Sequence, residues 1–443
     1  MQERAPRSAL EEWAEYDGVI PAPKTIEDTG INREFLLALM VKTIYLSGRD
    51  RASQLVSAMK IARSVVGELL EDARSLALME VRGAVDGSMS GEMRYGLTSK
   101  GHDWATEALR QSQYIGPVPV PFKDFCAQVA LQSILKERVT WEHLSESFNG
   151  LVLPADLLHR IGPAANSGKS ILLYGPPGNG KTCIAEAIGR AFQQTVYFPY
   201  AIDVDGQTIT FFDEMVHQRV PAMEGTSAVR APLASQQSQS SDARWVLCRR
   251  PVIMTGGELN LGMLDLTFNP HAKFYEAPLQ LKAINGVFVV DDFGRQQVDP
   301  QDILNRWIIP LERGVDYLSL HTGRKIPIPF DELVVFSTNM KPQELCDAAT
   351  LRRLYYKVEV PIPTEDDYIE IFKNVCRDKE ISLEEDIMPF LFEEFYGAKN
   401  LPRAGYHPTY LVDQVIAMCE YYNVPRRLDK NLIRLAWHNL YAS

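Results

Sequence analysis

The stretch that most limits how this chain can fold is GPPGNGKT, which runs from Gly175 to Thr182. It matches the pattern G-x-x-x-x-G-K-[ST], in which a glycine-rich loop leads into the first turn of a helix and cradles phosphate groups. The apolar run SILLY precedes it, and TCIAEAIGRAF follows it with helical spacing. Both neighbours that the motif requires are therefore present, and the chain is predicted to contain an α/β core with a parallel sheet.

Each residue type in this loop has a physical reason to be there. Glycines permit positive φ angles, so that successive backbone N–H groups can turn toward a phosphate. The helix that follows adds its positive N-terminal end. Lys181 is expected to reach the terminal phosphates, and the Thr182 hydroxyl is expected to bind Mg²⁺. The predicted ATP-binding residues are Gly175, Pro176, Pro177, Gly178, Asn179, Gly180, Lys181, Thr182 and Cys183.

A second feature is GVFVVDDFGRQ, residues 286–296, in which an apolar run leads into two carboxylates. The triplet Asp292-Phe293-Gly294 also occurs in protein kinases, but the HRD-x4-N loop and the early-strand lysine of a kinase are missing from this sequence. In a phosphate-loop enzyme, a strand that ends in Asp places its carboxylate against the metal. Asp291 is therefore predicted to join Thr182 as a Mg²⁺ ligand, and Asp292 is predicted to polarise the attacking water.

Further apolar runs predict additional strands of the same core. TVYFPY, WVLCRRPVIMTG and DELVVFSTN are strand candidates, separated by helical or loop segments as in a parallel sheet flanked by helices. The sequence from about residue 202 to 243 has no clear period and ends in ASQQSQSSDAR, which predicts a surface loop. After Pro363 the apolar spacing is helical to the end of the sequence.

The first 138 residues have a different character. Residues 1–30 are polar and predict a loosely held arm. Residues 31–115 show three helical segments, two short extended segments and a further helix, which is the order of a winged helix. Residues 116–138 begin with GPVPVPF and predict a Pro-rich linker followed by a helix.

A winged helix raises the question of DNA binding, and the charges argue against it. Residues 1–120 hold 14 Lys/Arg and 17 Asp/Glu, a net charge of −3. The helix that would read base edges carries Glu68, Glu71 and Asp72. Base reading calls for Arg, Lys, Asn or Gln on a background of phosphate contacts. DNA is therefore a less favoured partner than protein.

The motifs from about residue 140 onward resemble those of the AAA+ ATPases. Gly175–Thr182 matches the family's Walker A loop, and Val287–Asp292 matches its Walker B strand. VVFSTN matches the strand called sensor 1, which implies that Asn339 orients the attacking water. DAATLRRLYYKVEVP is similar to the segment of the arginine finger, a cation that reaches the γ-phosphate held by a neighbouring subunit. The resemblance implies Arg353 as the first choice for this role and Arg352 as the second.

The resemblance also implies a domain layout and partners. Residues 139–362 correspond to the family's αβα core, and residues 363–443 to its helical lid. The stretch from GGELNLGMLDL to FYEAPLQLKAINGVF, residues 256–288, is similar to the helix 2 insert of the MoxR-like, magnesium-chelatase-like and sigma-54-activator branches, and most similar to that of the MoxR-like proteins. Hydrolysis between subunits implies self-association, as a six-membered ring, and an unidentified client protein. Thr409 stands where the family's sensor 2 arginine is expected, with Arg403 nearby, so this role stays open.

Composition narrows the class of protein. The formal net charge is −11 and the isoelectric point is about 5.4, which disfavours a protein that coats nucleic acid. Six cysteines without a CxxC spacing indicate neither a disulfide framework nor a zinc site. The first residues lack an apolar signal segment, and the longest apolar run, FLLALMVKTIYL, is too short for a membrane span. These features predict a soluble, cytoplasmic protein.

Three functions fit these residues, in decreasing order of support. The first is an ATPase that uses hydrolysis to remodel a partner protein. The second is a DNA-acting regulator whose winged helix binds DNA and whose ATPase controls assembly. The third is an ATP-binding switch with negligible turnover, because Asp292 replaces the family's usual Glu with a shorter side chain and no sensor 2 arginine is evident.

Overall fold

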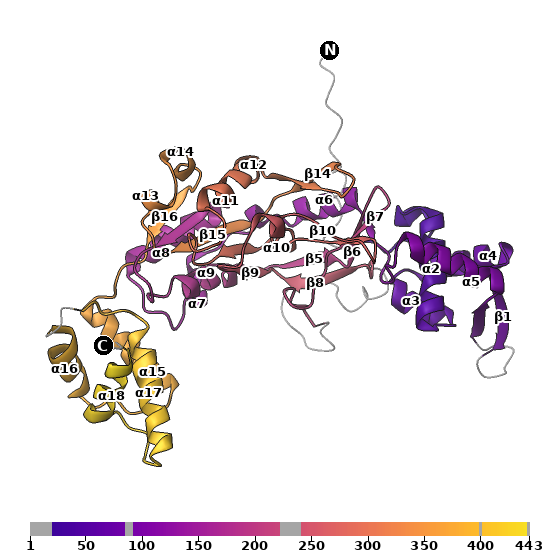
Figure 1. Ribbon diagram of the computed structural model, residues 1–443. Coiled ribbons are helices and arrows are strands. Elements are labelled where there is room, and N and C mark those ends of the chain that lie inside the picture. Colours follow the sequence, from indigo (N-terminus) through magenta and orange to yellow (C-terminus); the bar gives the residue numbers. More distant parts are fainter. Residues whose placement is uncertain (1–19, 85–91, 222–240, 398–400, 441–443) are drawn as a thin grey trace.

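The structure of the chain is a computed structural model that describes residues 20–84, 92–221, 241–397 and 401–440. Three bodies follow one another in Figure 1: an N-terminal body of helices with a small hairpin, a central body built on strands, and a C-terminal body of helices. The central body holds the sheet that positions the candidate site.

A five-stranded parallel sheet forms the middle of the central body, with the strand order β16-β4-β15-β12-β9. Its strands are β4 (Ile171–Tyr174), β9 (Val252–Thr255), β12 (Val287–Val290), β15 (Leu333–Thr338) and β16 (Tyr356–Glu359). Each pairing within it is parallel. Because parallel strands end at the same edge of a sheet, the residues that follow β4, β12 and β15 meet there.

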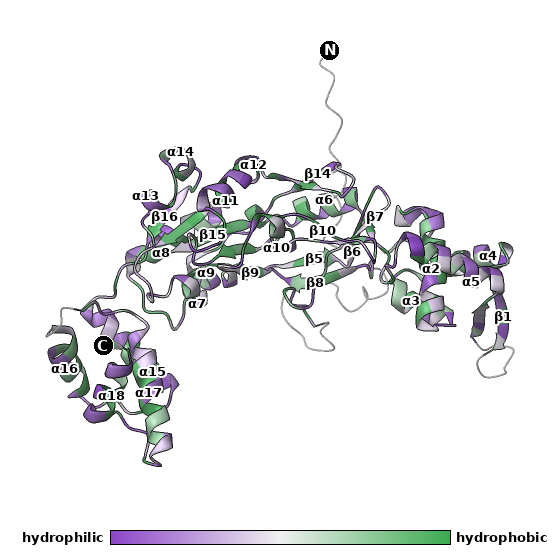
Figure 2. Ribbon diagram, in the orientation of Figure 1, coloured by the Kyte–Doolittle hydropathy of each residue, from purple (hydrophilic) through white to green (hydrophobic). Residues whose placement is uncertain are grey.

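Helices cover both faces of this sheet, which explains why its inner strands β12 and β15 are buried throughout and mostly apolar (Figure 2). Successive residues of a strand point to opposite faces. Val289 packs with residues of α8 (Ala155–Ser167) and α9 (Lys181–Arg190). Its neighbour Phe288 packs with residues of α11 (Pro300–Arg306) on the other face. This three-layer arrangement confirms the predicted α/β fold with a parallel sheet.

Short helical elements complete the central body. They are η2 (Ile134–Lys136), α7 (Trp141–Ser147), η3 (Leu261–Leu264), α10 (Leu279–Lys282), α12 (Ile308–Arg313), α13 (Pro342–Leu345) and α14 (Ala348–Leu351). Most of them lie between strands of the parallel sheet, as crossover connections require.

The structure corrects several strand predictions. β5 (Thr195–Pro199) and β8 (Trp245–Arg249) do not join the parallel sheet and instead form an antiparallel pair. β6 (Ala201–Val204) and β7 (Gln207–Thr210) form a hairpin inside the region that was predicted to be a loop. Residues 222–240 of that region lie outside the described residues. β16 is a strand that the sequence analysis missed.

A second, mixed sheet joins distant parts of the chain in the order β10-β11-β7-β6-β3. The strands not yet given are β3 (Val120–Pro121), β10 (Thr267–Asn269) and β11 (Phe274–Glu276). The hairpin of β13 (Val315–Ser319) and β14 (Lys325–Pro329) contacts this sheet through its tip, where the His321 ring stacks on Phe268 with 4.2 Å between centroids. The segment predicted as a helix 2 insert therefore supplies β10 and β11 to this sheet.

The N-terminal body has the element order that the sequence predicts for residues 31–115. Its elements are α2 (Arg33–Ser47), α3 (Ala52–Met59), α4 (Arg63–Ser75), β1 (Met79–Ala84), β2 (Met93–Leu97) and α5 (Ser99–Gln111). β1 and β2 pair antiparallel, and the helices share one apolar core. Residues 85–91, between β1 and β2, lie outside the described residues. The winged-helix assignment stays a prediction.

The segment before this body is not a loosely held arm over the part that is described. It contains η1 (Glu27–Thr29). Ile20 is buried with the core of the mixed sheet, and Ile26 is buried in the N-terminal core. The buried guanidinium of Arg244 donates to the carbonyl oxygen of Thr29 at 3.0 Å. Residues 20–30 therefore tie the N-terminal body to the central body, while residues 1–19 lie outside the described residues.

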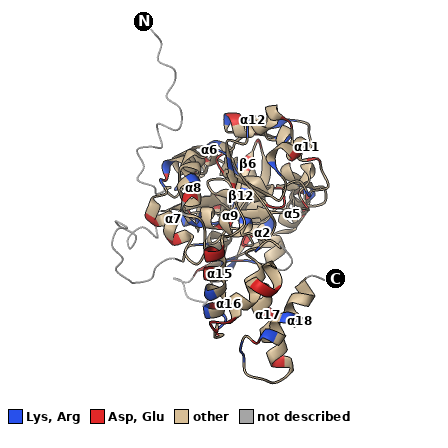
Figure 3. Cartoon of the chain, turned by 90° about the vertical axis from the view of Figure 1, so that its left-hand side faces the viewer, with Lys and Arg blue, Asp and Glu red and all other residues tan. Residues whose placement is uncertain are grey.

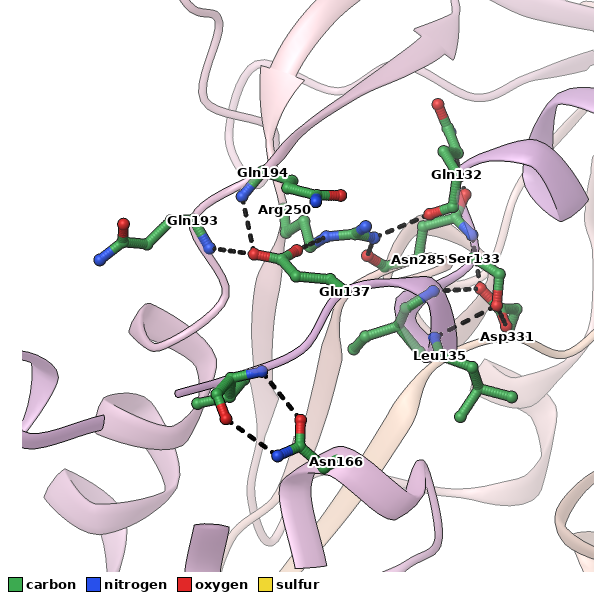
Figure 4. Close-up of polar contacts among 12 residues, drawn as sticks. Gln132, Ser133, Leu135, Glu137, Asn166, Gln193, Gln194, Arg250, Asn285 and Asp331 are labelled. Atoms are coloured by element: carbon green, nitrogen blue, oxygen red, sulfur yellow. Dashed lines mark hydrogen bonds and ion pairs between the residues drawn. The ribbon is translucent and has the colours of Figure 1, made fainter. Parts of the chain in front are cut away.

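The connector that follows α6 (Phe122–Leu131) is held in place by buried polar contacts (Figure 4). Glu137 and Arg250 form an ion pair at 2.6 Å, with both side chains buried. The other carboxylate oxygen of Glu137 accepts from the backbone N–H groups of Gln193 at 2.6 Å and Gln194 at 2.9 Å. Glu137 thus links the connector to the start of β9 and to the chain just beyond α9.

A second carboxylate, Asp331, holds the same connector to the start of β15 (Figure 4). It accepts from the hydroxyl of Ser133 at 2.7 Å and from the backbone N–H of Ile134 at 3.0 Å. The side-chain amide of Asn285, just before β12, also donates to it at 2.5 Å. The predicted linker therefore runs across the amino edge of the parallel sheet as part of the core.

The C-terminal body is a helical bundle with its own apolar core. Its elements are α15 (Glu365–Asp378), α16 (Ile387–Leu391), the π-helix η4 (Phe392–Gly397), α17 (His407–Tyr421) and α18 (Lys430–Leu440). Thr364 and Asp367 cap α15 reciprocally. Over the described parts of the chain, no helix has the length and apolar character that crossing a membrane requires.

We expect Glu137→Ala to destabilise the central body strongly, because it leaves the Arg250 charge buried without its partner. The cost of breaking a buried ion pair in this way is about 3–5 kcal/mol. Thermal unfolding followed by circular dichroism measures it. The matched control is Glu107→Ala, which removes the glutamate of an ion pair with side chains 74% and 59% exposed and should change stability by less than about 1 kcal/mol. Equal effects of the two variants would contradict a structural role for the buried pair.

Candidate functional site

The loop from Gly175 to Gly180 connects β4 to α9 at the carboxyl edge of the parallel sheet. Gly175, Gly178 and Gly180 have φ angles of +145°, +76° and +81°, which residues with a Cβ rarely adopt. At Gly175 a Cβ would also lie 2.3 Å from the carbonyl oxygen of Val360. The backbone path itself therefore requires these glycines.

The ammonium of Lys181 lies between this loop and the end of β15. It donates to the carbonyl oxygens of Gly175 at 3.0 Å and Pro176 at 2.8 Å. It also donates to Oδ1 of Asn339 at 2.8 Å. Two residues that were predicted from separate motifs, the Walker A lysine and the sensor 1 asparagine, are thus in direct contact.

The two carboxylates predicted from the end of β12 join the same group. Oδ2 of Asp291 accepts from the Thr182 hydroxyl at 2.8 Å, and Oδ1 of Asp292 accepts from the Asn339 amide at 3.2 Å. Desolvation lowers the pKa of Lys181, and the two carboxylates partly oppose that shift. The structure therefore brings together the lysine, the threonine, the asparagine and both acids at one edge of the sheet.

Thr182 and Asp291 fit a magnesium ion. A hydroxyl oxygen and a carboxylate oxygen that lie 2.8 Å apart are hard ligands directed at the same place. Mg²⁺ usually takes one or two protein oxygens and fills its other positions with phosphate oxygens and water. Among the described residues there is no group of three or more His, Cys, Asp and Glu side chains that could hold a metal by itself. The pair suits a metal that arrives together with phosphate.

These groups open into a cavity of about 680 Å³. Its phosphate end is lined by Pro177, Gly178, Asn179, Gly180, Lys181, Thr182, Cys183, Asp291, Asp292 and Asn339. Farther from the loop the walls are residues 150–154 and, on α15, Ile371, Asn374, Val375 and Asp378. An apolar wall with a few polar groups suits a nucleotide base. No motif in the sequence pointed to these wall residues.

Positive charge is scarce in this cavity. Lys181 is the one Lys or Arg among its described lining residues, against four aspartates, Asp291, Asp292, Asp367 and Asp378. Thr409, at the position expected for sensor 2, lines the cavity, whereas Arg403 does not. Nη1 of Arg403 instead lies 3.7 Å from Oε2 of Glu365. As described, the chain places no second cation of its own against the phosphate end.

The C-terminal body contacts the phosphate loop directly, which the sequence analysis did not predict. The backbone N–H of Gly405 donates to Oδ1 of Asn179 at 2.9 Å. The Tyr406 ring lies against Gly178, where a Cβ would come within 2.2 Å of it. The contact depends on two segments more than 200 residues apart, and no local pattern signals it.

The two candidate finger arginines lie outside the cavity, after α14. Arg353 is held within the chain, since its Nε donates to Oε1 of Glu312 at 2.8 Å and its Nη1 to the carbonyl oxygen of Ala349 at 3.0 Å. Arg352 is exposed. The sequence ranks Arg353 first for contact with another subunit, whereas these contacts make Arg352 the more available of the two.

Comparison with known proteins finds similarity over parts of this chain. Residues 364–439 match a family model described as a domain of unknown function (DUF8689). Spastin from Ixodes scapularis is 24% identical over 288 residues, a match that covers 65% of this chain and 33% of spastin. The chain thus spans about a third of the length of this relative. Spastin is an AAA ATPase.

Two solved structures resemble the chain over part of its length. The RuvB Holliday junction branch migration motor of Thermotoga maritima has a TM-score of 0.34 at 15% identity and covers 69% of this chain and 73% of its own. NtrX from Brucella abortus in complex with ATP has a TM-score of 0.38 at 14% identity and covers 62% of this chain and 54% of its own. The MoxR-like branch is not among these similarities and stays a prediction.

We expect Gly178→Ala to weaken nucleotide binding, because the added Cβ displaces the Tyr406 ring from the loop. The dissociation constant of a fluorescent ADP analogue should rise about tenfold, equal to 1.4 kcal/mol. The matched control is Gly206→Ala, at φ +79° with no neighbouring atom within 4 Å of the added Cβ. Both variants bear the strain of a left-handed alanine, about 1–2 kcal/mol, and only the first should lose affinity. Unchanged binding by Gly178→Ala would show that the Tyr406 contact does not shape the site.

Proposed function

We propose that this protein is an AAA+ ATPase that binds ATP with Mg²⁺, hydrolyses it at the interface between subunits and uses the energy to remodel a partner protein. One observation carries the proposal: Lys181 bonds to Asn339, Asn339 bonds to Asp292, and Thr182 bonds to Asp291, all around one cavity. Three sequence segments supply these groups at one sheet edge. The cytoplasmic location is proposed from the sequence alone.

In this proposal each side chain has one task. The loop N–H groups bind phosphate oxygens, and Lys181 turns from the loop carbonyls to the terminal phosphate as charge develops there. Asp292 and Asn339, already in contact at 3.2 Å, hold and polarise the attacking water. A magnesium ion held by Thr182 and Asp291 would supply Lewis-acid stabilisation of the phosphate charge.

A second copy of the chain completes the site in this proposal. Transfer of the γ-phosphoryl group develops charge that one lysine neutralises only in part. The cavity has no other Lys or Arg among its described lining residues, while Arg352 is exposed after α14. We propose that Arg352, with Arg353 as the second candidate, reaches the cavity of a neighbouring subunit. The proposed assembly is a ring of six subunits.

The alternative of a DNA-acting regulator is less favoured by the distribution of charge. In α4, Glu71 is exposed and Asp72 pairs with Arg33 at 2.6 Å, so the exposed Arg63 and Arg74 of this helix lie among carboxylates that oppose contact with phosphates. In the cartoon of Figure 3, Lys and Arg positions are interspersed with Asp and Glu positions along the helices in view. A low-turnover ATP switch remains the third alternative, because Asp292 is shorter than glutamate.

Steady-state phosphate release tests the proposed reaction. Lys181→Ala should lose both ATP binding and turnover, because it removes the cation that faces the phosphates. Arg352→Ala should keep ATP binding and lose turnover by roughly 10³-fold or more, the effect of a catalytic arginine supplied by a neighbour. The matched control Arg49→Ala removes an exposed arginine of the N-terminal body and should keep the wild-type rate.

Mixing two inactive variants tests whether the arginine acts on a neighbour. Arg352→Ala subunits keep an intact Asp292, and Asp292→Asn subunits keep an intact Arg352. A mixed ring therefore contains some interfaces with both groups, and turnover should reappear on mixing. An Arg352→Ala variant with full turnover, or a mixture that stays inactive, would contradict the proposed interface role of Arg352.

A further inference from the structure

The side-chain amide of Gln296 spans the ends of two neighbouring strands. Its Nε2 lies 3.2 Å from the carbonyl oxygen of Gly256, just after β9, and 3.2 Å from that of Asp291, just after β12. The same nitrogen lies 3.4 Å from the carbonyl oxygen of Asp292. Its Oε1 accepts from the backbone N–H of Gly294 at 2.8 Å. One half-buried amide thus contacts four backbone groups around the two acids.

The turn that Gln296 contacts has an unusual backbone. Asp292 has a φ of +48°, in the left-handed region that residues with a Cβ avoid. Strain of this kind persists only where the surroundings hold it. Here the Asp292 carbonyl oxygen accepts from the N–H of Arg295 at 2.9 Å, and the N–H of Phe293 donates to the carbonyl oxygen of Ser337 at 2.7 Å. The direction of the Asp292 carboxylate is set by this turn.

The backbone hydrogen bonds between β9 and β12 do not by themselves fix the positions of Asp291 and Asp292. The last ladder contact between β9 and β12 is the bond from the N–H of Asp291 to the carbonyl oxygen of Thr255, at 2.8 Å. Beyond this bond, the side chain of Gln296 joins Gly256 to the turn that follows β12. Gly256 is itself fixed, since its N–H donates to Oε1 of Glu258 at 2.9 Å.

We propose that Gln296 is a positioning residue for ATP hydrolysis, which acts by holding Asp291 and Asp292 in the orientation that turnover requires. This inference rests on the proposed function. Gln296 does not line the cavity, so it acts through the two acids and leaves the binding of the nucleotide base and phosphates to other groups. Its loss therefore lowers kcat and leaves the affinity for ADP without Mg²⁺ unchanged.

The test compares two variants with a control at the next residue. Gln296→Ala removes all four contacts, and Gln296→Glu keeps the acceptor for Gly294 and places a carboxylate oxygen against three carbonyl oxygens. Both should lower kcat by at least about tenfold, at the scale of a lost charge-positioning contact. Gln297→Ala should match the wild type, because Gln297 is exposed and makes no side-chain hydrogen bond with the described residues. Melting temperatures identify any variant that is merely misfolded.

Three outcomes would overturn the inference. They are wild-type kcat in both Gln296 variants, a parallel loss of ADP affinity and melting temperature, and a loss of kcat in Gln297→Ala as large as in Gln296→Ala. The failure of the proposed function looks different, because the wild-type protein would then release no phosphate from ATP and Lys181→Ala would change nothing. That result would overturn both proposals, whereas an active wild type with active Gln296 variants overturns this one alone.

Discussion

The ammonium of Lys181 is the group around which the candidate site is organised. A cation taken out of water needs oxygen partners, and here they come from two strand ends: the loop carbonyls after β4 and Asn339 after β15. Asn339 in turn donates to Asp292 after β12. The position of one charge therefore links three strands of the sheet, and a phosphate that draws Lys181 away from its carbonyls alters the surroundings of Asp292.

The sheet is fixed by polar contacts at both of its edges. At the amino edge, Glu137 and Asp331 hold the connector to the starts of β9, β12 and β15 (Figure 4). At the carboxyl edge, Lys181 and Gln296 join the ends of the same strands. Apolar packing alone tolerates small sliding between strands, whereas directional hydrogen bonds do not. The two sets of contacts thus hold both edges of a sheet built from short strands.

Much of the core could be predicted because its signals are local. The Walker A loop, the acids after β12 and Asn339 after β15 follow apolar runs, and parallel pairing brings them together. The β6–β7 hairpin could also have been predicted, because Asp205-Gly206 is a common two-residue hairpin turn. Contacts such as Tyr406 on Gly178 could not be predicted, because they depend on how distant segments pack. The contact between Glu312 and Arg353 could not be predicted for the same reason.

The most direct test of this account is calorimetric titration of the full chain with ATP, with and without Mg²⁺, in the wild type and in Asp291→Asn. The account predicts that Mg²⁺ tightens ATP binding in the wild type, because Thr182 and Asp291 share one metal position. It predicts that Asp291→Asn binds ATP without Mg²⁺ as the wild type does and loses most of the gain from the metal. ATP binding that is equally tight with and without Mg²⁺, or no binding at all, would contradict it.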